Sequence, residues 1–498
     1  MLKLLTSAQT KEADHYTVIN EPIRSSELME RAAKAFVKIF IEKLNDRKKH
    51  ILIFCGKGNN GGDGLAIARM LIDESYTQVK VFIADISTKS SKDFELNLER
   101  LQQKDTSIFY FKSSEEIDYQ ECDILIDALL GSGLNKPLEK EWEKAVKKIN
   151  QFSGYKVAVD VPTGMPCEGE LFNDVIVKSD WTITFQRPKL NFLLPISSPY
   201  IKEWKVVNIG LDENYIQSTA SPYYWFWKGD IQHYIKARQP FEHKGMLGHA
   251  LIIAGDDETM GAALIASEAC VKCGAGLTSS MIPESGLKAL NVRVPEAMFN
   301  NRAGLNDLDW EKFKVVGIGP GLGNNDRSLQ LLKTVLNNYK KPMVIDADAI
   351  NMIGENQELL KLVPENSVFT PHMKEFDRLF GIHDSWWQRI EKALKKAVEH
   401  KVYIVLKNRY SMIFTPEGIC YFNSSGSPAM ASGGMGDALT GIITSMISQG
   451  YPIEKAVQLA VFTHGFAGEQ LAQKMYIVPA TNLIKSLPYV LRELWSGK

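Results

Sequence analysis

The sequence predicts two α/β domains, each built on a mostly parallel sheet that helices cover. At 498 residues the chain exceeds the size at which a single hydrophobic core stops growing. In both halves, short apolar runs alternate with stretches of helical periodicity, the pattern of parallel strands joined by helices. A polar stretch without periodicity, residues 212–221, separates the two series. We therefore expect one domain over residues 1–212 and a second over residues 225–498.

In the first half, apolar residues at helical spacing predict two leading helices, near residues 8–18 and 25–45. Strands are expected at 51–55, 79–84, 108–111, 123–126, 157–159 and 181–185, and the alternation ends near 206–209. The second series predicts strands at 250–254, 315–319, 343–346, 368–370 and 402–406. It also predicts a helix over 261–274 and long helices after Gly436 and Tyr451. Cys270 and Cys273 fall in the helix over 261–274, and without a second pair to complete a zinc site we interpret them as packing residues.

Composition and charge exclude several classes of function. Hydrophobic residues at 45% and charged residues at 23% are typical of globular domains. With 58 basic and 59 acidic residues and no long basic block, a nucleic-acid partner is not expected. The N-terminus turns polar at Thr6, and no apolar run is long enough to span a bilayer. Six scattered cysteines are too few for a disulfide scaffold. We therefore expect a cytoplasmic enzyme without a membrane partner.

The first chemical motif is the loop Gly56-Lys-Gly-Asn-Asn-Gly-Gly-Asp-Gly64, directly after the strand at 51–55. Its five glycines let backbone N–H groups approach a ligand, and the helix start behind them favours a phosphate. A tight strand-to-helix turn would also need glycine. Asn59, Asn60 and Asp63, however, add side-chain oxygens that a turn does not require, so the loop favours a dinucleotide.

Two further polar loops follow strands of the same domain. Asp127-Ala-Leu-Leu-Gly-Ser-Gly-Leu-Asn-Lys-Pro137 follows the strand at 123–126, and Asp160-Val-Pro-Thr-Gly164 follows the strand at 157–159. Ligands of open α/β sheets bind at the carboxyl ends of the strands, so we expect the three loops to form one site. A strand-end aspartate can also merely cap the next helix, which explains one such residue better than three.

Together these segments resemble the NAD(P)H-hydrate epimerases over roughly residues 1–212. The resemblance implies a Rossmann-like α/β/α sandwich, in which Asp160 acts by acid–base catalysis at the reacting carbon of the hydrated nicotinamide. It also implies a potassium ion bound by Asn60, Asp127 and Thr163, whose oxygen ligands suit a hard cation. The implied substrate-binding residues are Asn59, Asn60, Gly61, Gly62, Asp63, Gly131, Ser132, Gly133, Leu134, Asn135, Lys136, Pro137 and Asp160.

The second half carries its own glycine-rich motifs: Gly317-Ile-Gly-Pro-Gly-Leu-Gly323, Thr370-Pro-His-Met-Lys-Glu375 and Gly433-Gly-Met-Gly-Asp-Ala-Leu-Thr-Gly441. The last is the most informative, because a Gly-x-Gly-Asp turn at a helix start supplies backbone donors for a phosphate and places a carboxylate beside them. A helix capped by an aspartate after a glycine turn would look the same if the motif stood alone.

These motifs, with His249 to Gly255 and Asp346-Ala-Asp348, resemble the ribokinase-like superfamily, and specifically its NAD(P)H-hydrate dehydratase branch, over about residues 225–498. The resemblance implies activation of the C6 hydroxyl by ADP or ATP with Mg²⁺, and then elimination, with Asp437 as the base. It implies substrate contacts by Ala262, Gly323, His372 and Asp437, and nucleotide contacts by Lys407, Asn408, Arg409, Tyr410, Ser411 and Gly436. We expect NADHX and NADPHX as substrates and a homo-oligomer.

The sequence departs from the family pattern in three places: Met435 replaces a small or hydroxyl residue, Met373-Lys374 replaces Pro-Gly, and Asn408 replaces glycine. None removes an Asp, His or Lys of the expected site. Three other readings remain: a small-molecule kinase of the ribokinase superfamily fused to a dinucleotide-binding module, a binding protein with a degenerate site, and a dehydrogenase. The two motif sets on one chain favour repair of hydrated NAD(P)H.

Overall fold

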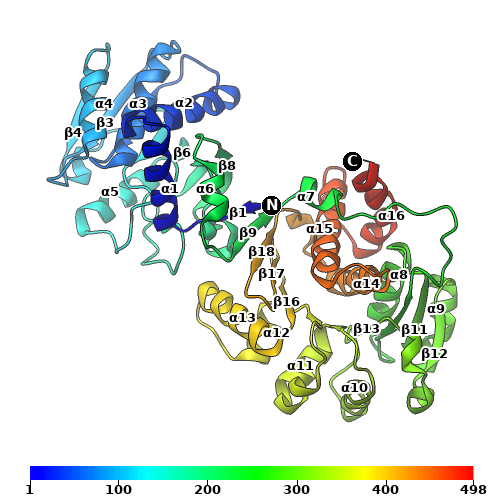
Figure 1. Ribbon diagram of the computed structural model, residues 1–498. Coiled ribbons are helices and arrows are strands. Elements are labelled where there is room, and N and C mark those ends of the chain that lie inside the picture. Colours follow the sequence, from blue (N-terminus) through cyan, green and yellow to red (C-terminus); the bar gives the residue numbers. More distant parts are fainter. Residues whose placement is uncertain (120–121, 497–498) are drawn as a thin grey trace. The chain divides into compact units, whose positions relative to one another are not determined.

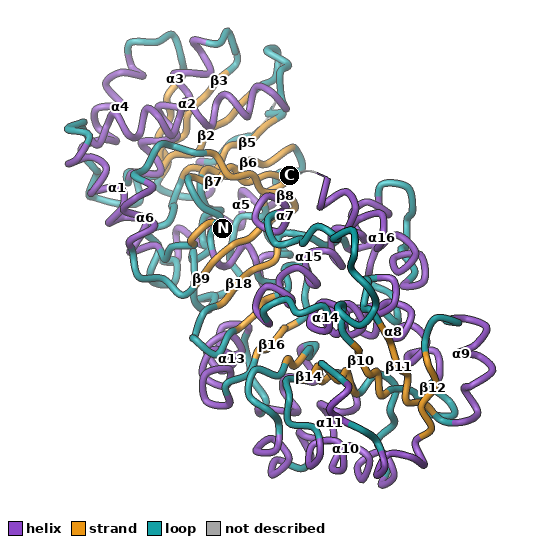
Figure 2. Tube along the Cα trace, turned by 45° about the vertical axis from the view of Figure 1, so that its right-hand side comes forward, coloured by secondary structure: helices purple, strands orange, loops and turns teal. Residues whose placement is uncertain are grey.

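The computed structural model describes residues 1–119 and 122–496, and these divide into two compact units (Figure 1). The N-terminal unit comprises Lys3–Ser221. The C-terminal unit begins at Pro222 and also includes Met1–Leu2. Both units are α/β (Figure 2), as the sequence predicts.

The N-terminal unit contains one seven-stranded parallel sheet in the order β4-β3-β2-β5-β6-β7-β8. Its strands are β2 (Ile51–Cys55), β3 (Val79–Ala84), β4 (Ser107–Phe111), β5 (Ile124–Ala128), β6 (Tyr155–Val159), β7 (Ser179–Phe185) and β8 (Ile201–Val207). Its helices are α1 (Ser7–Asn20), α2 (Ser25–Lys43), α3 (Asn59–Asp73), α4 (Lys92–Gln102), α5 (Lys140–Gln151) and α6 (Glu213–Ser218), with short 3₁₀ turns η1 (Ser114–Glu116), η2 (Leu190–Leu193) and η3 (Pro195–Ser197).

Both faces of this sheet are covered. Along β2, Ile51 and Ile53 face a core shared with α1 to α4, whereas Leu52 and Phe54 face a second core shared with α5. Helix α5 is amphipathic, which favours its formation against the sheet. Its buried residues recur at three- and four-residue spacing on one face: Trp142, Ala145, Val146 and Ile149. Burial on both faces explains the continuous apolar runs of the central strands.

The C-terminal unit contains a larger sheet in the order β1-β9-β18-β17-β16-β15-β14-β13-β10-β11-β12. It is parallel from β12 to β16, and β16, β17 and β18 pair antiparallel. The strands are β1 (Leu2–Lys3), β9 (Tyr223–Phe226), β10 (His249–Ile253), β11 (Leu277–Ile282), β12 (Met298–Asn301), β13 (Val315–Ile318), β14 (Met343–Ile345), β15 (Val368–Phe369), β16 (Tyr403–Leu406), β17 (Met412–Phe414) and β18 (Cys420–Asn423).

Helices lie on both faces of the parallel part of this sheet, with α8, α14, α15 and α16 on one face and α10 to α13 on the other (Figure 1). The helices are α7 (Lys228–Gln232), α8 (Met260–Lys272), α9 (Leu287–Arg293), α10 (Asp326–Asn338), α11 (Ala347–Glu355), α12 (Met373–Phe380), α13 (Trp386–His400), α14 (Met435–Ser448), α15 (Ile453–Ala472) and α16 (Ala480–Ser496). The 3₁₀ turns are η4 (Glu284–Gly286), η5 (Arg302–Asp307), η6 (Trp310–Lys312), η7 (Gln357–Leu362) and η8 (Pro428–Met430).

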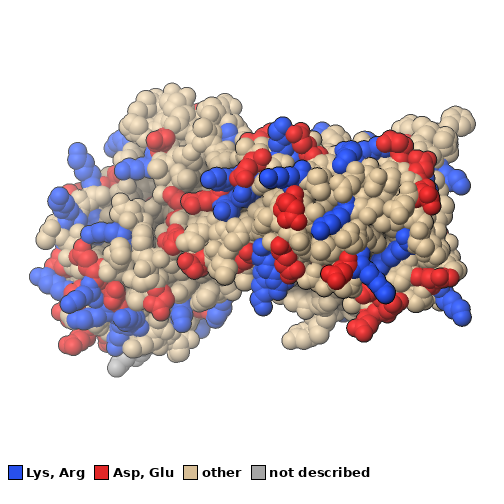
Figure 3. Space-filling view, turned by 90° about the horizontal axis from the view of Figure 1, so that it is seen from below, with Lys and Arg blue, Asp and Glu red and all other residues tan. Residues whose placement is uncertain are grey.

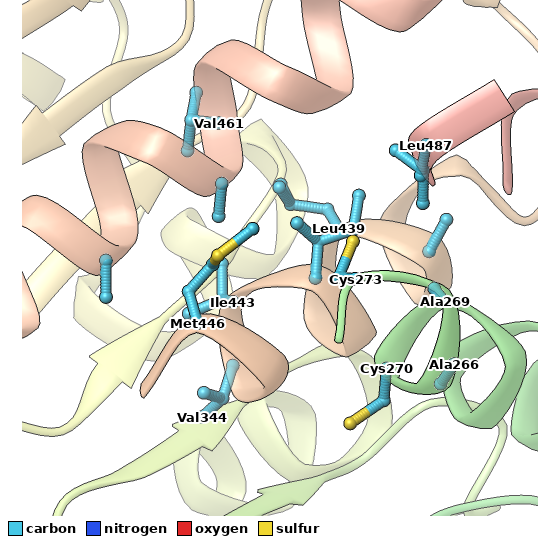
Figure 4. Close-up of a cluster of buried hydrophobic side chains, with 14 of the residues drawn as sticks. Ala266, Ala269, Cys270, Cys273, Val344, Leu439, Ile443, Met446, Val461 and Leu487 are labelled. Atoms are coloured by element: carbon cyan, nitrogen blue, oxygen red, sulfur yellow. The ribbon is translucent and has the colours of Figure 1, made fainter. Parts of the chain in front are cut away.

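The main core of this unit lies between α8 and α14. Leu439, Ile443 and Met446 of α14 face Cys270 and Cys273 at the end of α8 (Figure 4). Both cysteines are buried free thiols, so their interpretation as packing residues is confirmed.

The structure also differs from the sequence prediction. Helix α3 begins at Asn59, inside the segment expected as a loop, because only residues 56–58 are needed for the turn. The expected linker contains α6, which Asp212 caps through the N–H of Tyr215. A helix of six residues is too short to show periodicity. Strands β11, β12, β17 and β18 were not predicted.

Candidate functional site

In the N-terminal unit, the order of the strands in the sheet creates a switch point between β2 and β5, where a ligand site is expected. The chain runs outward from β2 to β3 and β4, then returns to β5 on the other side of β2. Ligands of open parallel sheets bind at such a switch point, at the carboxyl ends of the strands. The glycine loop follows β2, and Asp127 lies near the end of β5, so the predicted loops do lie at this edge.

The glycines of the first loop are required by close approach of backbone to backbone. A Cβ on Gly56 would lie 2.0 Å from the carbonyl oxygen of Leu129, and one on Gly61 would lie 1.6 Å from the carbonyl oxygen of Gly56. The loop is thereby held tightly against the loop after β5. This contact brings the two predicted binding segments together.

The three expected potassium ligands come from three neighbouring strand ends. The buried carboxylate of Asp127 accepts hydrogen bonds from the hydroxyl of Thr163 at 2.7 Å, its backbone N–H at 2.8 Å and the N–H of Leu129 at 3.2 Å. The side chain of Asn60 lies against Gly131, where an added Cβ would be 2.9 Å from its Oδ1. The buried Nδ2 of Asn60 has no hydrogen-bond partner among the described residues.

Asp160 follows β6 and is held in an unusual conformation. Its φ is 61°, in the left-handed region that non-glycine residues rarely adopt. Its Oδ1 accepts from Lys189 Nζ at 2.7 Å, from the hydroxyl of Thr184 at 3.0 Å and from the N–H of Phe185 at 3.0 Å. Each of these contacts uses Oδ1. Strained residues cluster at functional sites, so this outlier supports a functional role.

The loop at 131–137 is divided between the site and the surface. Gly131 contacts Asn60, and Leu134 packs on the α5 core. Gly133, Asn135, Lys136 and Pro137 are exposed, and Lys136 pairs with Glu139 at 2.8 Å. Only the first part of this segment therefore lies with the other predicted residues.

The C-terminal unit repeats the arrangement, with a switch point between β10 and β13. The glycine turn after β13 bends through positive φ at Gly319, Gly321 and Gly323. It packs on the start of α8, where a Cβ on Gly321 would lie 2.9 Å from that of Ala262. The N–H of Gly323 donates to Asp348 at 2.8 Å, so two predicted substrate contacts, Ala262 and Gly323, adjoin one turn.

A buried ion pair lies at the ends of β14 and β16. Lys407 Nζ lies 3.0 Å from Asp346 Oδ1 and 3.8 Å from Glu375, and the hydroxyl of Thr440 donates to Asp346 Oδ2 at 2.7 Å. Burial alone would raise the pKa of Asp346, but the ammonium of Lys407 and these hydrogen bonds hold it below its usual range. Lys407 correspondingly stays charged.

Asp437 lies in the first turn of α14, behind a glycine turn that contacts this pair. Gly434 caps the helix with φ 86°, and Gly436 approaches Lys407 so closely that an added Cβ would lie 3.2 Å from Nζ. Burial and the carboxylates of Asp346, Asp348 and Glu375 raise the pKa of Asp437 to about 6. The carboxyl group of Asp437 is therefore ionised at pH 7 and can accept a proton.

His372 and the segment after Lys407 complete the predicted set. His372 pairs with Lys407 across the sheet edge and caps α12, its Nδ1 accepting the N–H of Glu375 at 3.1 Å. Both side-chain polar atoms of Asn408 are buried and have no hydrogen-bond partner among the described residues. Arg409 lies over the ring of Tyr410 and 3.7 Å from Glu469.

Sequence reasoning missed three residues that shape these sites. Lys189 lies in a charged segment after β7, a strand-end signal like those used for Asp127 and Asp160. Thr440 lies one helical turn after Asp437, a spacing that places both on one side of α14. Asp14, on α1, has its pKa raised to about 6 by burial, with electrostatic contributions from Lys189 and Asp160, and no motif in the sequence marks it.

Fold and site together define a class of protein: two parallel α/β units, each with glycine turns and buried carboxylates at its strand ends, as in enzymes that act on nucleotides. Residues 25–191 match the family model described as YjeF-related protein N-terminus, and residues 250–489 match the model described as NAD(P)H-hydrate dehydratase.

Curated relatives match nearly the whole chain. The bifunctional NAD(P)H-hydrate repair enzyme of Thermofilum pendens is 30% identical over 516 residues, covering 99% of this chain and 97% of its own. Those of Coxiella burnetii and Archaeoglobus fulgidus are 31% identical (95% of this chain, 96% of their own) and 32% identical (93% of each). The chain belongs to the family of bifunctional NAD(P)H-hydrate repair enzymes.

Solved structures match the C-terminal unit. A ribokinase-like superfamily protein from Enterococcus faecalis is 30% identical with a TM-score of 0.52, covering 55% of this chain and 98% of its own. An ADP/ATP-dependent NAD(P)H-hydrate dehydratase from Bacillus subtilis, co-crystallised with ATP and Mg²⁺, is 28% identical with a TM-score of 0.50, covering 54% and 98%. The ribokinase-like fold expected for this unit is thereby confirmed.

Proposed function

We propose that this chain repairs hydrated NADH and NADPH with two sites. The N-terminal unit interconverts the R and S epimers of NAD(P)HX, and the C-terminal unit dehydrates the S epimer with ADP or ATP. Family membership supports this, and one observation carries it: each unit holds its own carboxylate at a strand-end site, the buried Asp160 in one and the half-buried Asp437 in the other. A kinase fused to a binding module would not need the first carboxylate.

In the N-terminal unit, Asp160 would act on the C6 hydroxyl of the substrate. Its Oδ1 is fixed by three donors, so its position is set before substrate arrives. The ammonium of Lys189 pairs with this carboxylate at 2.7 Å inside the unit. The other oxygen remains available for proton transfer. The glycine loop and Gly131 would hold the dinucleotide phosphates through backbone N–H groups.

In the C-terminal unit, Asp437 would take the proton of the C6 hydroxyl as that oxygen attacks the terminal phosphate of the nucleotide. The start of α14 offers backbone donors beside Lys407, which suits the charge on the transferred group. The C6–O bond of the resulting phosphate ester then breaks, inorganic phosphate leaves, and loss of a proton from C5 to solvent restores the ring double bond between C5 and C6. With ADP the other product is AMP, and with ATP it is ADP.

The residues of the N-terminal unit fit a potassium ion. Asn60, Asp127 and Thr163 offer amide, carboxylate and hydroxyl oxygens, the ligands of a hard cation, and two of these groups already adjoin, since the hydroxyl of Thr163 lies 2.7 Å from Asp127 Oδ1. A bound ion would neutralise charge beside the substrate. The described residues contain no group of three His, Cys, Asp or Glu that could bind a metal, so a transition-metal site is not proposed.

We also propose that the dehydratase site uses Mg²⁺ with its nucleotide, since a bound metal screens phosphate charge during phosphoryl transfer. The related dehydratase from Bacillus subtilis was co-crystallised with ATP and Mg²⁺, which supports this proposal. We place the chain in the cytoplasm, because its six cysteines are free thiols. No helix within residues 1–119 and 122–496 has the length and apolar character to cross a bilayer.

The function is tested by mixing the protein with chemically hydrated NADH and following NADH absorbance. We expect NADH to return only with ADP or ATP, and both epimers to be consumed. Replacing potassium by lithium should slow consumption of the R epimer and leave that of the S epimer unchanged. A stable phosphorylated product without NADH would instead indicate a small-molecule kinase.

A further inference from the structure

Arg302 lies at the edge of the sheet that carries the dehydratase site. Strands β10, β11 and β12 are parallel neighbours, so their carboxyl ends meet at one edge (Figure 2). Arg302 follows directly after β12, and its Nη2 donates to the carbonyl oxygens of Ala254, at 3.0 Å, and Gly255. Both carbonyls follow β10. The side chain therefore reaches past the end of β11 to the strand at the switch point.

The segment that Arg302 contacts also contacts the predicted substrate site. The N–H of Gly255 donates at 2.8 Å to the carbonyl of Pro320, in the glycine turn after β13. A Cβ added to Gly255 would lie 2.9 Å from that of Ala263, the neighbour of Ala262 on α8. Arg302 is thus separated by a single residue from the glycine turn and from the helix start that are predicted to contact the substrate.

The positive charge of Arg302 is not neutralised by the described part of the chain. The guanidinium bonds to neutral carbonyl groups and makes no ion pair there, and its buried Nε has no hydrogen-bond partner. The two nearby carboxylates face other groups. Asp257 accepts the hydroxyl of Ser285 at 2.5 Å. Asp256 faces Gly323, where an added Cβ would lie 3.0 Å from Oδ2.

Burial lowers the pKa of Arg302, and the carboxylates of Asp256 and Asp257 do not offset this effect. Withdrawing a cation from water without a partner costs free energy, which an anion at the same place would recover. The surroundings of Arg302 therefore favour an anionic ligand.

The substrate supplies such an anion. Each hydrated dinucleotide carries a pyrophosphate between its two nucleosides, and NADPHX carries a further phosphate on a 2′ oxygen. A guanidinium matches phosphate oxygens in both charge and geometry. The phosphates of ADP or ATP fit less well, because the nucleotide contacts are predicted around Lys407, after β16. That strand lies on the other side of the switch point from β12.

We propose that Arg302 binds a phosphate of the hydrated dinucleotide in the dehydratase site. This role rests on the proposed dehydratase function. The two carbonyls hold Nη2 in place, and Nη1 has no hydrogen-bond partner among the described residues, so its N–H groups can donate to phosphate oxygens. The contact is remote from the reacting ring. It stabilises the bound substrate and the transition state equally, so it lowers KM and leaves kcat unchanged.

The test measures dehydration of the S epimers of NADHX and NADPHX with ADP. Arg302→Gln keeps an N–H donor for the carbonyls but removes the charge. Its KM for the dinucleotide should rise about tenfold or more, the scale of a lost hydrogen bond to a charged group, with kcat within a few-fold of wild type. Arg302→Lys keeps the charge and should recover part of the affinity. KM for ADP should not change in either variant.

Arg492→Met is the matched control, because it also removes one exposed guanidinium. Arg492 lies over the ring of Trp495, 4.4 Å from its centroid, and lines a separate cavity of about 270–430 Å³ scale with Cys273, at the opposite end of α8 from Ala262. Both KM values and kcat of this variant should equal those of wild type. Thermal unfolding of each variant shows whether a change in KM reflects lost contacts or lost structure.

The two substrates distinguish the phosphates. An equal rise in KM for NADHX and NADPHX assigns the pyrophosphate to Arg302, and a rise for NADPHX alone assigns the 2′-phosphate. Wild-type KM for both dinucleotides in folded Arg302→Gln would overturn the proposal, and so would a rise in KM for ADP alone or a loss of kcat at unchanged KM. A wild-type protein that dehydrates neither substrate would instead overturn the proposed function.

Discussion

The carboxyl group of Asp160 shows how one residue is shaped for a task. The backbone of Asp160 has a positive φ, outside the range of a strand, and three donors hold one carboxylate oxygen in place. The same contacts make it structurally important, because Lys189 is buried and has no other carboxylate within ion-pair distance in the described part of the chain. Function and stability are therefore coupled at this position.

Asp160→Asn should abolish epimerisation and leave dehydration of the S epimer unchanged, because the amide cannot accept the proton. It should also lower the free energy of unfolding by about 3 kcal/mol, the scale expected when one member of a buried ion pair is removed. Kinetics on each epimer and thermal unfolding check both effects. Adding Lys189→Met should restore stability but not activity, and normal turnover of the R epimer by Asp160→Asn would contradict the role.

Asp437 gives the dehydratase a pH dependence. Its pKa is raised from 3.8 to about 6, and a base must be ionised, so the rate of dehydration should fall about tenfold per pH unit below pH 6. Asp437→Asn should lose a hundredfold or more at all pH values while still binding ADP by calorimetry. A rate that stays constant down to pH 5, or near-normal NADH regeneration by the variant, would reduce Asp437 to a helix cap.

The raised pKa of Asp437 also makes the free energy of unfolding depend on pH. Because the folded pKa lies above the unfolded value, Asp437 contributes stability that is present below pH 4 and is lost as the pH rises through 6. Asp437→Asn should therefore be more stable than wild type above pH 6, and the two should converge near pH 4. Denaturant unfolding at pH 4 and pH 8 measures this, and a variant less stable than wild type at pH 8 would contradict it.

At the scale of the element, the start of α14 depends on one glycine. Gly434 has φ 86°, and a Cβ there would lie 2.7 Å from Ile265 and 3.1 Å from Ala480. Gly433, its neighbour, has open space around the same position. The two glycines therefore have different structural requirements although they adjoin in the sequence.

Gly434→Ala should destabilise the protein by about 1–2 kcal/mol, because alanine is strained in this conformation. It should also lower the affinity for ADP, because the anion-binding turn would shift. Gly433→Ala is the matched control and should leave both unfolding and nucleotide binding near wild type. Equal effects of the two changes would show that the turn does not require a left-handed residue.

The elements that could be predicted from sequence are those with a strong local pattern. Strands β2 and β3 have the predicted bounds, because both are apolar runs bounded by polar residues. Strand β12 was missed, because Met298 to Asn301 alternates weakly at the sheet edge. Helix α3 begins before its predicted start, since Gly61, Gly62 and Gly64 do not signal a helix and are tolerated there only because nearby chain segments approach closely.

In the candidate sites too, the residues that could be predicted are those with a strong local sequence pattern. The strand-end rule and the motifs place Asp127 and Asp160 at the ends of the neighbouring strands β5 and β6, and Asp437 beside the Asp346–Lys407 pair at the ends of β14 and β16. Asp14 could not be predicted, because its electrostatic interaction with Asp160 and Lys189 joins distant parts of the chain. Local sequence therefore indicates strand-end residues and misses those that helices bring from elsewhere.

At the scale of the whole molecule, basic and acidic residues are nearly equal in number, 58 against 59. On the face shown in Figure 3, basic and acidic side chains are interspersed, consistent with a net charge of -1. The expected homo-oligomer stays a prediction, which light scattering of the purified protein would test. What the structure does offer at this scale is two units with separate cores.

The two units should function independently. The N-terminal unit buries its own apolar cores between the sheet and α1 to α5, and the C-terminal unit has a distinct core centred on α8 and α14. A domain with its own core can fold alone. We propose residues 1–212 and 225–498 as the two functional domains, and contacts divide the chain between Ser221 and Pro222, so a fragment of residues 1–221 retains α6.

That fragment should unfold cooperatively and should epimerise the R form without nucleotide, at a rate within a few-fold of the full chain. It should not regenerate NADH with ADP or ATP, because Lys407 and Asp437 are absent. Circular dichroism establishes folding, and a mixture of the fragment with residues 222–498 should restore the complete repair of both epimers. A fragment that folds but leaves the R epimer untouched, while the full chain consumes it, would show that the first site needs the C-terminal unit.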